Sequence, residues 1–153
     1  MDIKSLTLEL ECWAKGRWKN AAELITKHHQ GELLEPLNDK LPAAEHGRRL
    51  HNNTQIIQRA FRGETAHYRR LAIALAPAVR AAIGEEEQQQ QEEHRQVAIA
   101  NRECIEATSA MLLRKPSGVI QQETLEAINA LASLAGMKVQ ISHQGGRHGS
   151  HAA

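Results

Sequence analysis

The sequence is poor in aromatic residues and in cysteine. Of its 153 residues, two are Trp, one is Tyr and one is Phe, and the two cysteines, Cys12 and Cys104, lie far apart with no CxxC spacing. Ala, Leu, Gln, Glu and Arg dominate instead, which favours helices packed through small aliphatic side chains. The length suits one ordinary core, or a small domain joined to an assembly element. We therefore expect an all-α protein whose thiols serve in packing.

Long apolar runs are also missing. The charge-free run from residue 71 to residue 79 is far shorter than the roughly 18 to 20 residues that a membrane span requires, and Pro77 interrupts it. No signal peptide precedes Trp13, and no cysteine spacing indicates a disulfide framework. These absences predict a protein of the reducing cytoplasm that does not cross a membrane.

Sequence motifs of catalysis are missing as well. There is no glycine-rich phosphate loop after a strand, no HExxH, and no Ser or Cys with a base at a predictable spacing. His28 and His29 are adjacent on a predicted helix, so they point to different faces. His143, His148 and His151 stand in a Gly- and Ser-rich stretch without acidic partners. We expect a protein that is not an enzyme and that uses no cofactor, metal or small-molecule substrate.

Charge is divided unevenly along the chain. Residues 1–83 hold 13 Lys and Arg against 9 Asp and Glu, a net of +4, whereas residues 84–153 hold 6 against 9, a net of −3. Such an asymmetry is typical of a binding domain followed by an assembly domain. The basic excess is modest, so a nucleic-acid partner would have to be held by specific contacts or by several copies of the chain.

The first half of the chain reads as a series of short helices. Apolar spacing and caps predict helices over residues 3–13, 21–29, 52–62, 65–76 and 78–83, with residues 32–49 as a mostly extended connection. Asn20 is the expected cap of the second helix, and Gly31 its end. Pro77 is expected to end one helix and to start the next. The connection contains Pro36, Pro42 and Gly47, and it is long for a helix-turn-helix, whose turn usually has about three or four residues.

The segment from Asn52 to Gly63 is the candidate recognition helix. Ile57 and Phe61 share a buried face, which leaves polar side chains for the outer faces. Gln pairs with adenine edges and Arg with guanine edges or phosphates. An amphipathic helix with a wet face of Gln and Arg is the ordinary alternative. The predicted DNA-binding residues are Asn53, Thr54, Gln55, Gln58, Arg59 and Arg62, with Arg48 and Arg49 as phosphate contacts or, equally, as a solvated surface pair.

The second half predicts an assembly element. No Pro or Gly occurs from Glu85 to Arg114, so one long helix is expected there, with the acidic run at its start solvated. Two adjacent seams at heptad spacing run along it, which suits a four-helix bundle better than a two-stranded zipper. A further helix is predicted over residues 119–135, with Gly136 as its cap. The predicted self-association residues are Val97, Ala98, Asn101, Cys104, Ile105, Thr108, Met111 and Leu112.

Several segments in order carry a family resemblance. They run from Trp13-Ala14 through residues 21–25 and the motif Asn53-Thr54-Gln55-x-Ile57-x-Arg59 to residues 75–78. Over roughly residues 1–84 the chain resembles the YdaT family of prophage-encoded regulators. This family is named as a family of toxins, and it is related in role to the lambdoid CII transcription factors. The resemblance implies a domain of the POU-specific or repressor type and a long helix that assembles a tetramer. It also implies that Thr54, Gln55, Gln58, Arg59 and Arg62 face DNA.

The predicted organisation has three parts: a helix-turn-helix domain over residues 1–84, a helical oligomerisation region over 85–136 and a disordered tail over 137–153. The preferred hypothesis is a prophage-encoded transcriptional regulator of the bacterial cytoplasm and nucleoid. It would bind operator DNA as a homo-oligomer, with a tetramer preferred to a dimer. The alternative is a toxin or adaptor whose long helix binds another protein.

Overall fold

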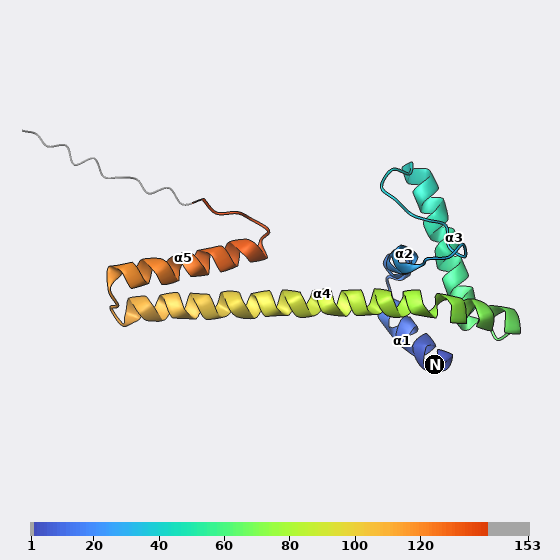
Figure 1. Ribbon diagram of the computed structural model, residues 1–153, viewed down its shortest axis with the longest axis horizontal. Helices are drawn as coiled ribbons and strands as arrows, with labels where there is room; N and C mark the ends of the chain where they lie inside the picture. Colours follow the sequence, from blue (N-terminus) through green and yellow to red (C-terminus); the bar gives the residue numbers. More distant parts are fainter. Residues whose placement is uncertain (1, 141–153) are drawn as a thin grey trace, which may run out of the picture. The chain divides into compact units, whose positions relative to one another are not determined.

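A computed structural model describes residues 2–140 of the chain (Figure 1). Its helices are α1 (Ile3–Ala14), α2 (Trp18–His28), α3 (Ala43–Arg62), α4 (Ala66–Leu112) and α5 (Ser117–Leu134). Residues 2–140 contain no strand, which confirms the prediction of an all-α protein. The chain divides into two compact units, Met1–Gln89 and Gln90–Ala153. Most of the predicted tail, with its three histidines, lies outside the described residues.

The first two helices lie close to their predicted bounds. Asp2 caps α1, where its carboxylate accepts a hydrogen bond from the Lys4 backbone N–H at 3.0 Å. Gly16 turns the chain into α2 with a φ of 76°, a left-handed conformation that favours glycine. The start of α2 differs from the prediction, because Arg17 rather than Asn20 occupies its N-cap.

The helix α3 begins at Ala43, nine residues before the predicted start at Asn52. Pro42 occupies its N-cap, and the helix continues through Gly47 despite a propensity cost of about 1 kcal/mol. Glu45 offsets that cost, because its carboxylate pairs with Arg48 three residues on and with Arg49 four residues on. The connection between α2 and α3 is therefore limited to residues 29–42.

The prediction that Pro77 ends a helix is wrong. Helix α4 runs without a break from Ala66 to Leu112, with Pro77 and Gly84 inside it. Pro77 and the exposed Ile73, whose carbonyl lacks its usual N–H partner, lie on the solvent side, where water can satisfy that carbonyl. Leu75 and Val79 are buried on either side of the proline, and their packing holds the two parts of the helix in line.

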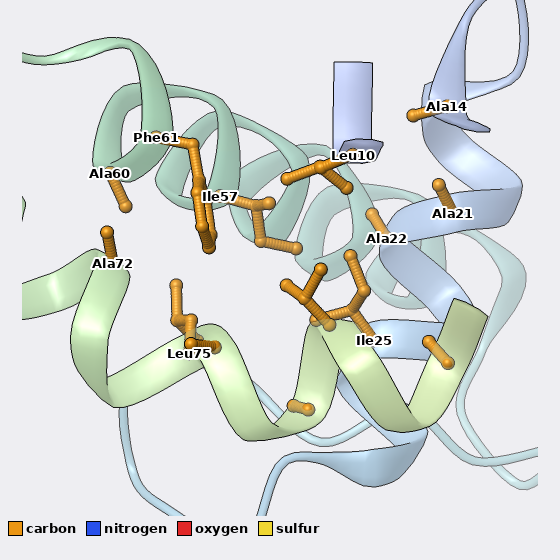
Figure 2. Packing of buried hydrophobic residues seen from close by; sticks show 14 of the residues in the cluster. Leu10, Ala14, Ala21, Ala22, Ile25, Ile57, Ala60, Phe61, Ala72 and Leu75 are labelled. Carbon is orange, nitrogen blue, oxygen red and sulfur yellow. The ribbon is translucent and has the colours of Figure 1, made fainter. Parts of the chain in front are cut away.

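The core of the first unit gathers side chains from α1, α2, α3 and the beginning of α4 (Figure 2). Its largest fully buried apolar residues are Leu6, Leu10, Ile25, Ile57, Leu75 and Val79. Phe61 projects from α3 toward Leu75, and the methyl groups of Ala60 and Ala72 lie on the facing sides of α3 and α4 (Figure 2). Small side chains at this crossing let the two helices approach closely, so α4 supports α3 from behind.

Ion pairs tie the acidic start of the long predicted helix to the first two helices. Glu86 accepts hydrogen bonds from Trp13 and Arg17, and Glu85 pairs with Lys27 and with His28. The side-chain hydrogen bond from Arg17 is the largest cause of the lowered pKa of Glu86. These two carboxylates are thus structural members of the first unit, not part of a solvated lead-in.

The second unit is a helical hairpin. Helix α5 runs back beside the last part of α4 (Figure 1). Ala100 and Ala110 of α4 and Ala127 of α5 are buried. Gly136 ends α5 as predicted, with a φ of 66° and a hydrogen bond from Met137 N–H to Ala132 O at 2.8 Å. None of the described helices is both long and apolar enough to cross a membrane.

Candidate nucleic-acid interface

The outward face of α3 contains an open groove of about 480 Å³. Gln55 and Arg59 line it, one helical turn apart, as the sequence predicts for residues that share a face. Gln58 lies on the adjacent turn and is half-buried. The residues that line the groove are Glu35, His51, Asn52, Gln55, Ile56 and Arg59.

Arg59 is the cation on this face that is available to a ligand. Its side chain is exposed, and it forms no hydrogen bond or ion pair with any residue between positions 2 and 140. Its fork of N–H donors therefore remains open for a planar acceptor such as a guanine edge or a phosphate. Gln55 adds an amide beside it, which can pair with adenine.

Asn53 does not belong to the outward face. Its side chain is 0% exposed and holds the connection before α3: its amide nitrogen donates to Glu35 O at 2.8 Å, and its amide oxygen accepts from Glu35 N–H at 2.9 Å. The same nitrogen also donates to the hydroxyl of Thr26 at 3.2 Å. The side chain of Asn53 therefore has a structural role instead of the predicted DNA contact, because every polar atom of its amide has a partner inside the protein.

Thr54 also faces inward. It is 7% exposed, and its hydroxyl donates to the carbonyl oxygen of Leu50, one turn earlier in the helix, at 2.7 Å. Ile57, three residues on, belongs to the core. Thr54 therefore lies on the buried side of α3 with Ile57. It does not belong to the outward face on which it was predicted.

The two arginines predicted as phosphate contacts are paired within the chain. Arg48 bonds to Glu45 at 2.7 Å and to Glu35 at 2.9 Å, and Arg49 bonds to Glu45 at 2.8 Å and to Pro36 O at 3.0 Å. Hydrogen bonds from Arg48 and then Arg49 lower the pKa of Glu45 to about 2. Two carboxylates therefore balance two guanidinium groups, and this corner of the surface has no net charge.

Arg62 is likewise held by its own chain. Its Nε donates to Glu11 Oε1 at 2.6 Å and its Nη2 to Glu11 Oε2 at 3.0 Å, while the guanidinium lies 5.1 Å from the ring centre of Trp18. This bidentate pair and the cation–π contact connect the end of α3 to α1 and α2. Arg62 thus joins three helices and is less available to DNA than Arg59.

Sequence reasoning missed Glu35, His51, Asn52 and Ile56 as residues of the groove. The helix was predicted to begin at Asn52 after a connection over residues 32–49, so His51 was assigned to neither element and Asn52 to a cap. Glu35 reaches the groove only because Asn53, 18 positions later, holds its peptide group. No spacing rule relates those two positions.

One family model matches the chain over residues 5–130, and its description is "Bacterial toxin ydaT". The chain belongs to this family. No curated protein and no solved structure matches the chain. The YdaT match extends well beyond residues 1–84, on which the sequence resemblance rests, and it includes α2 to α4 and most of α1 and α5.

The predicted self-association residues of this YdaT chain lie along one side of α4 in the second unit. Ile105 is 65% exposed and Leu112 is 79% exposed, and Val97 and Met111 are each about half-exposed. Asn101, Cys104, Ile105, Thr108 and Ser109 line a shallow groove of about 410 Å³. Helix α5 covers the other side of α4, around Ala100 and Ala110, so it leaves this side open.

The hairpin brings three carboxylates together that the sequence keeps apart. One oxygen from each of Glu103, Glu123 and Glu126 lies within 4.8 Å of the others, a spacing that could hold a cation. Glu103 already pairs with Arg102 at 2.7 Å. Sequence reasoning missed this group because it depends on how α4 and α5 are aligned.

Proposed function

We propose that this YdaT-family protein is a prophage-encoded regulator that binds specific double-stranded DNA through the outward face of α3. The observation that carries the proposal is the exposed and unpaired Arg59 in the same groove as Gln55. Arg and Gln are the side chains that read guanine and adenine edges in the major groove. The proposal includes no catalysis and no cofactor, and it places the protein on the nucleoid in the bacterial cytoplasm.

The arrangement of helices supports α3 as a recognition helix. Helix α2 packs against α3, and the beginning of α4 packs behind it through Phe61 and Leu75. A recognition helix needs such support, because its outer side chains must be held rigidly against the groove. In this interpretation residues 29–42 replace the short turn of an ordinary helix-turn-helix, in the manner of a POU-specific or repressor domain.

Self-association would supply the affinity that the modest net charge does not. We propose that the open side of α4 joins copies of the chain, with a tetramer preferred to a dimer. This assembly is supported by the exposure of Val97, Ile105 and Leu112, because apolar side chains gathered on one surface are typical of a protein-binding site. Two or more linked α3 helices would then bind neighbouring sites on one duplex with greatly increased avidity.

The test is a gel-shift titration with duplexes from the chain's own genomic neighbourhood. Arg59→Ala and Gln55→Ala should weaken binding to the preferred duplex by roughly tenfold or more, since a bidentate base contact is worth about 1–3 kcal/mol. Arg80→Ala is the matched control, because Arg80 is also exposed but lies on α4. It should bind nearly as the wild type does. If all three variants bind alike, α3 is not the reading element.

Oligomerisation is tested separately by sedimentation. Ile105→Asp places a charge on the open side of α4 and should give monomers, whereas Arg95→Ala, an exposed substitution elsewhere on the same helix, should leave the assembly intact. A wild-type chain that sediments only as a monomer at micromolar concentration would contradict this part of the proposal.

A second candidate function is a toxin or adaptor that acts by binding another protein. The exposed apolar residues of the second unit favour it, since Leu112, Leu131 and Met137 are all half-exposed or more. Affinity for DNA separates the two functions. A DNA-binding regulator shows a steep loss of affinity with rising salt, whereas a protein that binds only proteins shows no such DNA complex.

A further inference from the structure

Glu35 stands on the edge of the proposed DNA-binding face, although it comes from the connection before α3. Asn53 fixes both the N–H and the carbonyl of Glu35, at 2.9 Å and 2.8 Å. These two bonds hold the backbone of Glu35 against α3. Its side chain lines the groove that Gln55 and Arg59 also line.

The carboxylate of Glu35 bonds to two side chains on the outer surface of α3. It accepts a hydrogen bond from Arg48 at 2.9 Å and one from the Asn52 amide at 3.3 Å. These bonds favour the ionised carboxylate. A carboxylate therefore lies in the groove that the unpaired Arg59 also lines, at a surface that would have to approach phosphates.

A carboxylate in this place has two consequences for a duplex that approaches α3. Together with Glu45 it pairs with Arg48, which would otherwise be a phosphate contact, and it cancels a positive charge that would attract phosphates. Phosphate contacts are the same in every sequence, so both effects weaken binding to all DNA alike. Base contacts from Gln55 and Arg59 then decide which duplex is bound.

We propose that Glu35 is a specificity-determining residue, which together with Glu45 neutralises Arg48 and Arg49 toward DNA phosphates, so that the complex depends on base contacts. The inference rests on the proposed function, since it requires that α3 meets DNA. It assigns to Glu35 the suppression of binding to random sequence. In this arrangement Asn53 is the positioning residue for Glu35.

The experiment compares Glu35→Gln with the wild-type protein on two probes: a duplex selected by the wild type from a random pool, and a mixed-sequence duplex of the same length. Glu35→Gln keeps the shape of the side chain and leaves the backbone clamp intact, so the variant should fold. Glu9→Gln is the matched control, because it removes one exposed carboxylate of α1, away from the groove. Affinity is measured across a series of salt concentrations.

Without the charge of Glu35, Glu45 alone faces Arg48 and Arg49, so the cluster gains one net positive charge for a phosphate contact. This change should raise affinity for the mixed duplex roughly fivefold to tenfold near 0.1 M salt and steepen the salt slope by about 0.9. The preference for the selected duplex should fall. The double variant Glu35→Gln/Arg48→Gln should lose this gain, and Glu9→Gln should show little of it.

The possible failures are distinct. If the folded wild type and Glu35→Gln both bind no duplex, the proposed function fails. If the wild type binds DNA and Arg59→Ala weakens that binding, but Glu35→Gln changes neither affinity nor salt slope, only the role of Glu35 is overturned. A gain that persists in Glu35→Gln/Arg48→Gln, or that Glu9→Gln matches, also overturns it.

Discussion

Replacing Asn53 with alanine removes three hydrogen bonds from the interior of the first unit at once. The amide of Asn53 bonds to the backbone N–H and carbonyl of Glu35 and to the hydroxyl of Thr26, at 2.9, 2.8 and 3.2 Å. Alanine leaves these groups without their partner at a position where the native side chain is fully buried. At about 1 kcal/mol for each bond, Asn53→Ala should lower the free energy of unfolding by about 3 kcal/mol.

Urea denaturation followed by circular dichroism at 222 nm measures this change. With a denaturant slope of about 2 kcal/mol per molar urea, a loss of this size moves the midpoint by about 1.5 M. Asn52→Ala is the neighbouring control. Its side chain makes one long, part-buried bond, to the Glu35 carboxylate at 3.3 Å, so the stability of this variant should stay within about 0.5 kcal/mol of the wild type.

The aspartate variant tests the direction of the bonds. Asn53→Asp keeps the size of the side chain but replaces the donor nitrogen with an oxygen, so the bonds to Glu35 O and Thr26 Oγ1 lose their donor. It should be less stable than Asn53→Ala at neutral pH, because it also buries a charge, and it should regain stability in acid. If Asn53→Ala costs less than about 1 kcal/mol, the clamp on Glu35 is not what holds residues 29–42.

Three further predictions concern local features. Burial lowers the pKa of His29 below 6.5, and its Nε2 is buried without a partner among residues 2–140. As pH falls, the unfolded chain therefore takes up a proton before the folded protein does, so stability should fall as pH drops through 6.5. The variant His29→Gln should flatten that part of the profile of melting temperature against pH. Arg114 has a φ of 51° at the end of α4, so Arg114→Gly should raise the free energy of unfolding by up to about 1 kcal/mol, and a loss in urea titration would argue against strain there. A Cβ on Gly63 would meet the Tyr68 ring and lie 2.7 Å from the Arg59 carbonyl oxygen, so Gly63→Ala should cost about 1–3 kcal/mol by the same titration, and an unchanged midpoint would show that the turn can shift.

The all-helical fold could be predicted because most helices carry strong periodic patterns. The apolar spacing of residues 3–13 and 119–135 matches α1 and α5 closely, and Gly136 ends α5 in the left-handed conformation expected of it. The start of α3 could not be predicted, since ion pairs of Glu45 override the local signals of Pro42 and Gly47. The predicted helix end at Pro77 was wrong for a similar reason, because tertiary packing on both sides of the proline holds α4 together.

The candidate site was predictable only in part. Gln55 and Arg59 lie on the outward face because Ile57 and Phe61 fix the inward one. Helical spacing did not reveal that Asn53 is turned inward, nor that residues distant in sequence occupy Arg48 and Arg62. Such pairings depend on the tertiary fold, so composition and spacing overstate the number of arginines that can meet DNA.

If α3 is a recognition helix, Arg59 and its neighbours on α3 read a DNA sequence. Enrichment of duplexes from a random pool, carried out in parallel with the wild type and Arg59→Ala, tests this role. We expect the wild type to enrich one recurrent sequence and Arg59→Ala to lose preference at a guanine within it. A wild-type protein that is folded and yet enriches no sequence, or an Arg59→Ala variant that enriches the same one with undiminished preference, would show that α3 does not read DNA through Arg59.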